Sequence, residues 1–451
     1  MTHIKIVFWG GLALLALLWW LADPSAVQQT EFFALRGSAM QLTGILAIGC
    51  MSFAMMLALR PRWPERWLGG LDKMYRLHKW FGIGALVVAV THWLWAQGPK
   101  WAVGFGWLER PARGPRPPAD NVLEEYLRSL RGTAEDVGEW AFYAALLLIA
   151  VALIRRIPYS FFYKTHRLIA VAYLVLVFHT VVLFQFSYWL TPLGLLMAVM
   201  LAWGTVAAVL VLLRRVGAGR KVAGTIVRLH YYPSLRVLEG EIDIPEGWPG
   251  HKAGQFAFVS GHAGEEPHPF TIASAWNPAE HRLTFIAKEL GDFTSTLRDT
   301  RRVGEAVLIE GPYGCFTFDD ACPTQIWVGA GIGITPFIAG MKQLALKRQA
   351  GSDGTPSKEI HLFHSTADYS EEAIAKLTAD AEAAGVRFHL YYDARDGRLT
   401  GDRIRAAVPG WREASIWFCG PPRFGAALRA DFARHGLNVA TRFHQELFQF
   451  R

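Results

Sequence analysis

The sequence predicts a membrane-embedded bundle of six α-helices, followed by an antiparallel β-barrel domain and an α/β nucleotide-binding domain. Before about residue 221, long apolar runs alternate with charged connectors, which is typical of helices that span a bilayer. After that point the runs shorten to strand length between Gly and Pro turns, and strand–turn–helix patterns follow. The 451 residues are 52% hydrophobic and 19% charged, more apolar and less charged than a typical soluble domain. We expect the three domains to cover residues 1–217, 218–322 and 323–451.

Six apolar runs each approach the ~20 residues needed to cross a bilayer. They cover residues 6–22, 39–59, 80–97, 140–154, 168–186 and 189–213. The first run has two interpretations. Lys5 before it and the small Ser25 and Ala26 after it are compatible with a signal peptide. Its long apolar core and the bulky Trp19 and Trp20 favour a helix that is retained.

Positive charge collects in alternate connectors between these runs. The N-terminus and connectors 60–79, 155–167 and 214–221 carry 15 Lys and Arg against two acids. Connectors 23–38 and 98–139 carry seven against nine. The positive-inside rule therefore predicts a multi-pass protein of the inner (plasma) membrane, with both termini and the whole second half in the cytoplasm.

The overall charge has the same origin. Residues 1–221 hold 22 basic and 11 acidic residues, or +11, and residues 222–451 hold 24 and 27, or −3, which sums to the +8 of the chain. The basic excess thus reflects the topology of a protein in the lipid bilayer, and we expect no nucleic-acid partner. The four cysteines form no CxxC pair and no zinc-like spacing, which argues against an iron–sulfur cluster and a disulfide framework.

Four histidines lie in or at the ends of two predicted spans, His78 and His92 on the third and His166 and His179 on the fifth. Ionisable side chains at membrane depth are costly and normally functional. Fourteen residues of helix separate His78 and His92 by about 21 Å and point them within about 40° of each other. If the fifth span does the same, each depth has two imidazoles across the bundle, which suits axial ligation of haem iron. The topology pairs His78 with His166 and His92 with His179.

The spacing of 13 on the fifth span does not fit an ideal helix. It rotates His179 by about 220° from His166. We therefore expect a π-bulge or another distortion between them, because a straight helix could not point both rings inward.

The second half contains short strands and two polar motifs. We expect strands over residues 221–229, 235–244, 255–260, 268–273, 282–289 and 306–309. The motif His268-Pro269-Phe270-Thr271 lies on the fourth of them. The motif Gly291-Asp292-Phe293-Thr294 follows the fifth, where the free N–H groups of a beginning helix suit a phosphate.

A strand at 325–328 leads into Gly329-Ala-Gly331-Ile-Gly333-Ile-Thr335-Pro336-Phe337 and then a helix. Strand, glycine turn and helix form a cradle in which backbone N–H groups can approach a pyrophosphate. A later strand at 415–418 runs into Cys419-Gly420-Pro421-Pro422 and another helix. The second turn strengthens the nucleotide-binding interpretation, and a small core residue without thiol chemistry is the alternative interpretation of Cys419.

Together, HPFT, GDFT, GAGIGITPF, CGPP and the two histidine pairs resemble the ferric reductase and NADPH oxidase superfamily. The resemblance implies a six-helix domain with two b-type haems, joined to a ferredoxin-reductase-like module with sites for FAD and for NADPH or NADH. The haem ligands would be His78, His166, His92 and His179. The FAD would be lined by His268, Pro269, Phe270, Thr271, Phe293 and Thr294. The nicotinamide nucleotide would be lined by Gly329, Gly331, Gly333, Thr335 and Pro336, with Cys419, Gly420, Pro421 and Pro422.

The family carries a late aromatic residue that stacks on the flavin. This chain ends in Glu446-Leu-Phe448-Gln-Phe450-Arg451, which leaves Phe448 and Phe450 as two candidates for that role. A closing strand with alternating apolar residues is the alternative interpretation.

These features predict an enzyme that passes electrons from cytoplasmic NAD(P)H through FAD and two haems to an acceptor on the outer face. A ferric chelate is the expected acceptor, and dioxygen, giving superoxide, is the alternative. A protein partner on the outer face stays open. A rival of another class is a histidine-containing transporter with a regulatory nucleotide-binding domain, which does not explain the paired spacing or the motifs.

Two details bear on the substrates. Arg36, at the outer start of the second span, could attract an anion or stabilise superoxide, and the alternative is an interfacial arginine that extends to the lipid headgroups. The strand at 360–363 is followed by His364-Ser365-Thr366, without the acid that binds a ribose diol. We therefore favour NADPH over NADH. The outer connector 98–139 matches no pattern that we can assign, apart from a possible helix at 121–131.

Overall fold

The structure of the protein, a computed structural model, describes residues 2–109, 118–119, 121–154, 156–261, 265–351 and 358–446. The described chain forms two compact units. One contains residues 2–68 and 73–216 and is helical; the other contains residues 69–72 and 217–446 and holds both β-sheets.

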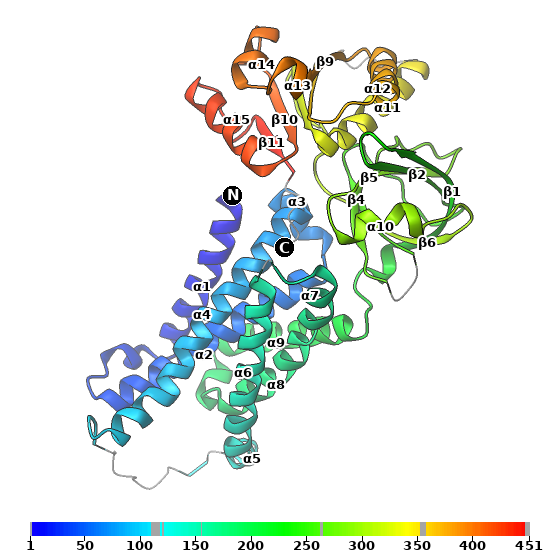
Figure 1. Ribbon diagram of the computed structural model, residues 1–451. Helices are drawn as coiled ribbons and strands as arrows, with labels where there is room; N and C mark the ends of the chain where they lie inside the picture. The colour runs from blue at the N-terminus through cyan, green and yellow to red at the C-terminus, as the bar shows by residue number, and fades with distance from the viewer. Residues whose placement is uncertain are drawn as a thin grey trace. The chain divides into compact units, whose positions relative to one another are not determined.

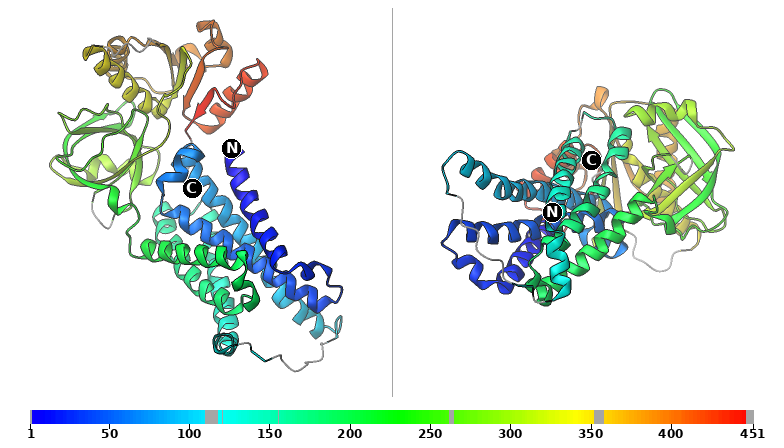
Figure 2. Two further views of the ribbon diagram at one scale, coloured as in Figure 1. Left: turned by 180° about the vertical axis from the view of Figure 1, so that it is seen from behind. Right: turned by 90° about the horizontal axis from the view of Figure 1, so that it is seen from below.

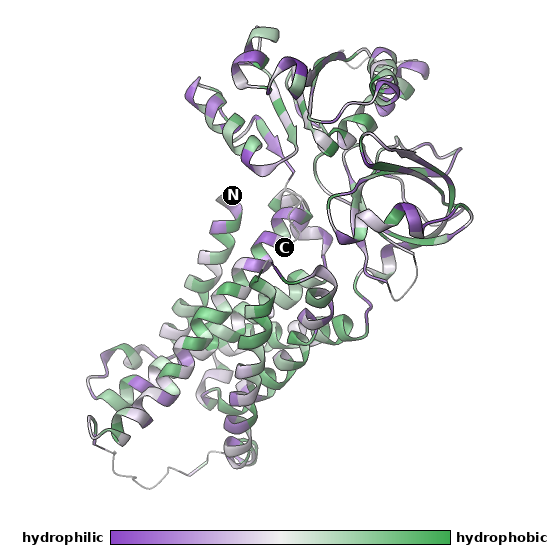
Figure 3. Ribbon diagram, in the orientation of Figure 1, coloured by the Kyte–Doolittle hydropathy of each residue, from purple (hydrophilic) through white to green (hydrophobic). Residues whose placement is uncertain are grey.

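Six helical segments of the described residues are long and apolar enough to cross a membrane, as the sequence predicts (Figures 1 and 3). They are α1 (Thr2–Ala22), α2 (Phe32–Ala58), α4 (Leu71–Gly104), α6 (Arg131–Leu153), α7 with α8 (Tyr159–His166 and Ile169–Leu183) and α9 (Pro192–Leu212). Short helices α3 (Arg62–Leu68) and α5 (Val122–Ser129) and the 3₁₀ turns η1 (Pro24–Gln28) and η2 (Phe186–Leu190) lie between them. The helix expected at 121–131 is α5, which Asn121 caps by accepting a hydrogen bond from the Glu124 N–H at 2.9 Å.

Small residues let these helices approach closely. Helix α2 packs along α9, and α6 packs along α8. Gly49 of α2 lies against Leu15 of α1, and Gly204 of α9 lies against the hydroxyl end of Tyr173, with no room for a Cβ atom at either glycine. Close backbone approach through glycine is a common way to pack helices in lipid, where apolar surface alone gives little driving force between helices.

The fifth span is distorted between its two histidines, but the expected π-bulge is wrong. Helix α7 ends at His166, and α8 begins at Ile169 after a turn at Arg167 and Leu168. The backbone bonds there join residues three apart, from Leu168 N–H to the Thr165 carbonyl at 2.9 Å and from Ala170 N–H to the Arg167 carbonyl at 3.1 Å. Such 3₁₀ bonding turns the chain by about 120° per residue and so overwinds the span. Each such residue adds about 20° to the rotation, which moves His179 from about 220° towards a full turn relative to His166.

A six-stranded antiparallel sheet forms the first part of the second unit. Its strands are β1 (Lys221–Tyr232), β2 (Val237–Asp243), β3 (Phe256–Ser260), β4 (His268–Thr271), β5 (Arg282–Lys288) and β6 (Ala306–Tyr313), in the order β4-β3-β6-β1-β2-β5. A bridge between Ile272 and Phe285 joins the two edges, so that the sheet closes into a barrel (Figure 2). Buried residues such as Ile242, Leu283 and Ile309 fill its interior. Helix α10 (Asp292–Thr300) follows β5.

A five-stranded parallel sheet forms the second part. Its strands are β7 (Thr324–Ala330), β8 (Glu359–Thr366), β9 (Arg387–Tyr392), β10 (Ser415–Cys419) and β11 (Phe443–Gln445), in the order β11-β10-β7-β8-β9. Helices α11 (Thr335–Gln349) and α12 (Glu371–Ala384) contribute to the core on one face. Helices α14 (Gly401–Ala407) and α15 (Pro422–Arg434) contribute to the core on the other. The bundle, barrel and α/β sheet confirm the predicted fold class.

Candidate functional site

The bundle brings the four intramembrane histidines together in the predicted pairs. The ring centres of His78 and His166 lie 5.9 Å apart at an interplanar angle of 69°. The ring centres of His92 and His179 lie 6.4 Å apart at 84°. A metal bonded to an imidazole nitrogen at about 2.0–2.1 Å leaves the centres of two opposing rings about 6 Å apart. Both separations therefore leave room for one metal atom between the rings.

Hydrogen bonds hold Nδ1 of three of these rings. Nδ1 of His78 lies 2.9 Å from the Ala54 carbonyl oxygen, and Nδ1 of His179 lies 2.7 Å from that of Ala134. Nδ1 of His92 lies 3.0 Å from Oγ1 of Thr43. An N–H donated in this way fixes the tautomer and leaves Nε2 as the coordinating nitrogen, as is usual for histidines that bind metals. In the described residues the buried Nδ1 of His166 has no hydrogen-bond partner.

Glycines lie beside both rings of the second pair. A Cβ atom at Gly138 of α6 would overlap the His179 ring, and one at Gly44 of α2 would lie 3.3 Å from Cε1 of His92. The described residues contain no cluster of three or more His, Cys, Asp or Glu side chains arranged for a metal ion. Two imidazoles per site would suit a metal whose other ligands a macrocycle supplies, whereas a protein-only metal site does not fit this donor set.

Arg36 has a structural partner that the sequence analysis did not foresee. Its Nε donates to the Trp95 carbonyl at 2.9 Å and its Nη2 to the Ala96 carbonyl at 3.3 Å. Pro99 lies inside α4 and has no N–H to give to Trp95, four residues earlier. Arg36 therefore supplies a hydrogen bond that Pro99 removes, one turn beyond His92.

The barrel motifs HPFT and GDFT meet through their side chains. The rings of His268 and Phe293 are stacked, with centres 3.4 Å apart and planes inclined by 12°. Burial lowers the pKa of His268 to about 4, with a smaller contribution from Arg301, so the ring is neutral at neutral pH. The side chain of Phe270 packs against the barrel core, and Thr271 is buried.

The GDFT turn is ordered by Thr294. Its Oγ1 accepts hydrogen bonds from the N–H groups of Leu290, at 3.0 Å, and Gly291, at 3.2 Å, at the start of α10. His268 and Phe293 thus form a flat, neutral aromatic platform beside an ordered helix start, which could hold part of a planar cofactor.

The two predicted nucleotide turns lie side by side because β7 and β10 are neighbours, with Gly329 opposite Cys419. A Cβ atom at Gly333 would overlap the backbone of Cys419 and Gly420. Gly331 has a φ of +55° and, within the described chain, nothing within 4 Å of its Cβ position. The strand edge therefore presents an open glycine turn.

Two helices begin at this edge, α11 at Thr335-Pro336 and α15 at Pro422. Proline is well tolerated there because the first N–H groups of a helix have no partner within it. Helix α11 continues the 3₁₀ turn η4 (Gly331–Ile334), and the Thr335 N–H donates to the Ile332 carbonyl, so the N–H groups that could bind phosphate are those of the glycine turn and of the start of α15. Cys419 is 1% exposed within the hydrophobic core, and burial raises the pKa of its thiol, which favours a packing role.

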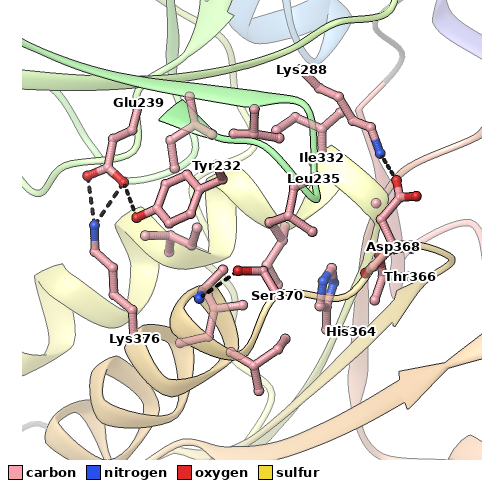
Figure 4. A pocket seen from close by; sticks show the side chains of 18 of the residues that line it. Tyr232, Leu235, Glu239, Lys288, Ile332, His364, Thr366, Asp368, Ser370 and Lys376 are labelled. Carbon is pink, nitrogen blue, oxygen red and sulfur yellow. Dashed lines mark hydrogen bonds and ion pairs between the residues drawn. The ribbon is translucent and has the colours of Figure 1, made fainter. Parts of the chain in front are cut away.

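A pocket opens beside the glycine turn, between the barrel strands and helices α11 and α12 (Figure 4). Gly331 and Ile332 line it, together with residues that the sequence analysis did not single out as ligands. Lys288 Nζ lies 2.5 Å from Oδ2 of Asp368, and Lys376 Nζ lies 2.7 and 2.8 Å from the two carboxylate oxygens of Glu239. These ion pairs join strands of the barrel to the end of β8 and to α12.

Asp368 and His364 lie near the end of β8, where the sequence suggested no acid. Asp368 lies two residues beyond the strand and lines the pocket, so an acid is present near the position where the sequence pattern suggested none. His364 Nδ1 lies 3.1 Å from the Gly329 carbonyl oxygen, and burial lowers its pKa to about 4. The proposed flavin-stacking residues Phe448 and Phe450 lie outside the described residues.

Comparison with known proteins identifies two segments of the chain. Residues 43–177 match the family described as ferric reductase like transmembrane component. Residues 224–317 match the family described as FAD-binding domain. The first segment contains Thr43 and three of the four histidines, and the second contains both HPFT and GDFT.

Individual relatives share 30% or less of their residues with this chain, over part of its length. An NADPH oxidoreductase of Mycobacterium tuberculosis is 30% identical over 216 residues, covering 46% of this chain and 55% of the relative. A superoxide-generating NADPH oxidase heavy chain of Dictyostelium discoideum is 27% identical over 322 residues, covering 64% and 59%. The FAD/NAD binding domain of nitric oxide dioxygenase from Vibrio cholerae is 19% identical, covers 50% of this chain and 98% of that structure, and has a TM-score of 0.42.

The chain spans about half the length of the curated relatives it matches. The comparisons give the transporter interpretation no support. Both matched segments and the oxidase relatives agree with the motifs quoted from the sequence, and together they support the resemblance of this chain to the ferric reductase and NADPH oxidase superfamily.

Proposed function

We propose that the protein is a transmembrane oxidoreductase that takes electrons from NADPH and delivers them to an acceptor on the opposite side of the membrane. In this proposal residues 1–217 hold two b-type haems, residues 218–322 hold FAD and residues 323–451 bind the nicotinamide nucleotide. The observation that carries it is the presence of two imidazole pairs, with ring centres 5.9 and 6.4 Å apart, at two depths of one bundle.

The bound groups would supply the redox chemistry: a flavin accepts two electrons as hydride and releases them singly, and an iron held by two imidazoles accepts one at a time. The task of the helical unit is to hold the four rings in fixed orientations. The Ala54 and Ala134 carbonyls and the Thr43 hydroxyl do so through Nδ1. Neutral imidazole is the form that can coordinate a metal, and an apolar bundle favours that form.

The second unit binds and orients the cofactors. The stacked and neutral rings of His268 and Phe293 provide a platform for FAD. The glycine turn before α11 and the start of α15 offer N–H groups to the pyrophosphate of the nicotinamide nucleotide. Lys288, whose present partner is Asp368, offers a positive charge to a phosphate at the pocket wall.

The charge distribution supports an orientation with the nucleotide sites in the cytoplasm and the His92–His179 pair near the outer face. Electrons would then pass from the His78–His166 pair to the His92–His179 pair, in the inner (plasma) membrane. The paired histidines and the reductase motifs together support this order of electron transfer. A flavoprotein without the bundle would have no path for electrons across the membrane.

A ferric chelate is the acceptor we propose, in keeping with the ferric reductase match over residues 43–177. Two donor groups of Arg36 are bonded to α4 carbonyls, so the guanidinium is not wholly available to stabilise superoxide. Production of superoxide from dioxygen is the second candidate, and the similarity to the Dictyostelium oxidase favours it.

One experiment separates these functions. Purified protein reconstituted in lipid vesicles is given NADPH or NADH with ferric citrate, under argon and under air, and ferrous iron and superoxide are measured separately. The proposal predicts iron reduction under argon and faster turnover with NADPH. Superoxide production in air without iron reduction under argon would support the second candidate. Absence of haem and flavin absorbance in the pure protein would refute the proposed function.

A further inference from the structure

The His92 ring is held differently from the other three rings. In the described chain the Nδ1 partners of His78 and His179 are backbone carbonyls, and Nδ1 of His166 has none. Nδ1 of His92 lies 3.0 Å from the side chain of Thr43, and the backbone of Met40, one turn earlier on α2, is a second hydrogen-bonding partner of the ring. The orientation of this ring therefore depends in part on a side chain that substitution can remove.

The hydroxyl proton of Thr43 is already used. Thr43 Oγ1 donates to the Ala39 carbonyl of its own helix at 2.6 Å. A hydroxyl has one proton to donate, so towards His92 its oxygen acts as an acceptor. His92 must then carry its proton on Nδ1, and Nε2 is the nitrogen left for coordination.

The next residue, Gly44, makes room for the same ring. A Cβ atom added at Gly44 would lie 3.3 Å from Cε1 of His92, tighter than ordinary van der Waals contact, and 3.6 Å from Nδ1. One short segment of α2 therefore sets the tautomer of the ring through Thr43 and leaves space for it at Gly44.

We propose that Thr43 is a positioning residue for the outer haem, acting through His92, an inference that rests on the proposed function. Its hydroxyl oxygen fixes the His92 tautomer and, by accepting a hydrogen bond from Nδ1–H, makes the imidazole a stronger donor to iron. Loss of such a partner typically weakens metal binding by about 10- to 100-fold. A weaker imidazole donor also favours the reduced iron, so the midpoint potential of one haem should rise while the other stays constant.

The test uses full-length protein in detergent with four substitutions. Thr43→Val removes the hydroxyl at similar size, Thr43→Ala removes it with less volume, and Thr43→Ser keeps it. Thr180→Val is the matched control, because Thr180 adjoins His179 but its Oγ1 donates to the Leu176 carbonyl of its own helix at 2.8 Å. Haem content per flavin, low-spin electron paramagnetic resonance signals and midpoint potentials are measured.

We expect Thr43→Val and Thr43→Ala to shift one of two haem components to higher potential and to alter its low-spin signal, or to lose that haem with flavin retained. Thr43→Ser and Thr180→Val should match the wild type. Unchanged potentials and signals in both Val and Ala variants at position 43 would overturn the inference, as would an equal shift in Thr43→Ser. A wild-type protein without bis-imidazole haem signals would instead overturn the proposed function.

Discussion

The two imidazole pairs lie in the same bundle but are built differently. In the His92–His179 pair both rings have Nδ1 partners, and glycines of two further helices lie against them. In the His78–His166 pair one ring has a carbonyl partner, while the buried Nδ1 of the other has none in the described chain and its ring stacks on Phe162, with centres 4.9 Å apart. The two pairs therefore have similar distances between ring centres, but their rings are not held equally firmly.

This difference suggests that the helices hold the two sites by different means. Hydrogen bonds and close glycine contacts fix the His92–His179 pair, which makes it sensitive to small changes on α2 and α6. The His166 ring lies at the end of α7, beside the overwound turn, and depends on packing. Substitutions should therefore affect the His92–His179 pair in proportion to how directly they act on its two rings.

The largest effect is expected from His92→Leu, which removes a ligand of the pair. We expect loss of one of two haems and of nearly all transfer to an external acceptor, with NADPH-driven flavin reduction unchanged. Stopped-flow absorbance of flavin and haem, together with ferric reductase turnover, measures both. Full turnover in this variant would show that the pair is not on the electron path.

Gly138→Val should displace His179, because a Cβ atom at Gly138 already overlaps its ring. Overpacking of this kind typically costs about 1–3 kcal/mol of stability, and here we expect partial loss of the same haem. Gly82→Ala is the control, since nothing in the described chain lies within 4 Å of its Cβ position on α4. Equal haem content in the two variants would contradict the close packing at His179.

Arg36→Gln should have a smaller effect. Pro99 leaves the Trp95 carbonyl without a helical donor, and the substitution weakens or removes the donor that Arg36 supplies instead. We expect the free energy of unfolding to fall by about 1–3 kcal/mol. Thermal unfolding in detergent and the potential of the outer haem would report it.

Pro99→Ala offers the complementary change, because the alanine N–H can donate the helical hydrogen bond that the Trp95 carbonyl lacks in the wild type. In the double variant, Arg36→Gln should destabilise less than it does in the wild-type background. If the two changes simply add, Arg36 does not compensate for Pro99.

Lys288→Met should leave both imidazole pairs unaffected while weakening nucleotide binding. Loss of a charged hydrogen bond to a phosphate is worth about 1.5–3 kcal/mol, so we expect KM for NADPH to rise about tenfold or more. Steady-state kinetics and haem spectra of the same sample test both parts. An unchanged KM would remove Lys288 from the proposed nucleotide site.

The sequence predicted those features that follow from periodicity and motif spacing. Six apolar runs predicted the spans, and the separation of His78 from His92 predicted two rings at two depths. The glycine turns at Gly329 and Gly420 were correctly placed at strand ends, because neighbouring parallel strands end at one edge of a sheet.

Features that depend on contacts distant in sequence could not be predicted in this way. The Thr43–His92 bond joins residues 49 apart, and the Lys288–Asp368 ion pair joins residues 80 apart. No local pattern encodes such pairs. Pro99 lies just beyond the third predicted span, so only the extension of α4 to Gly104 shows that a carbonyl one turn earlier needs a donor, and only the packing of α2 on that turn identifies Arg36 as the donor.

The central claim is that each pair of imidazoles holds one haem. Quantitative haem and flavin analysis of the purified protein, combined with a redox titration, tests it most directly. The account predicts two bis-imidazole low-spin haems per flavin, with His92→Leu removing one and leaving the other at its original potential. A wild-type protein with no haem or a single haem, or a His92→Leu variant that keeps two, would contradict it.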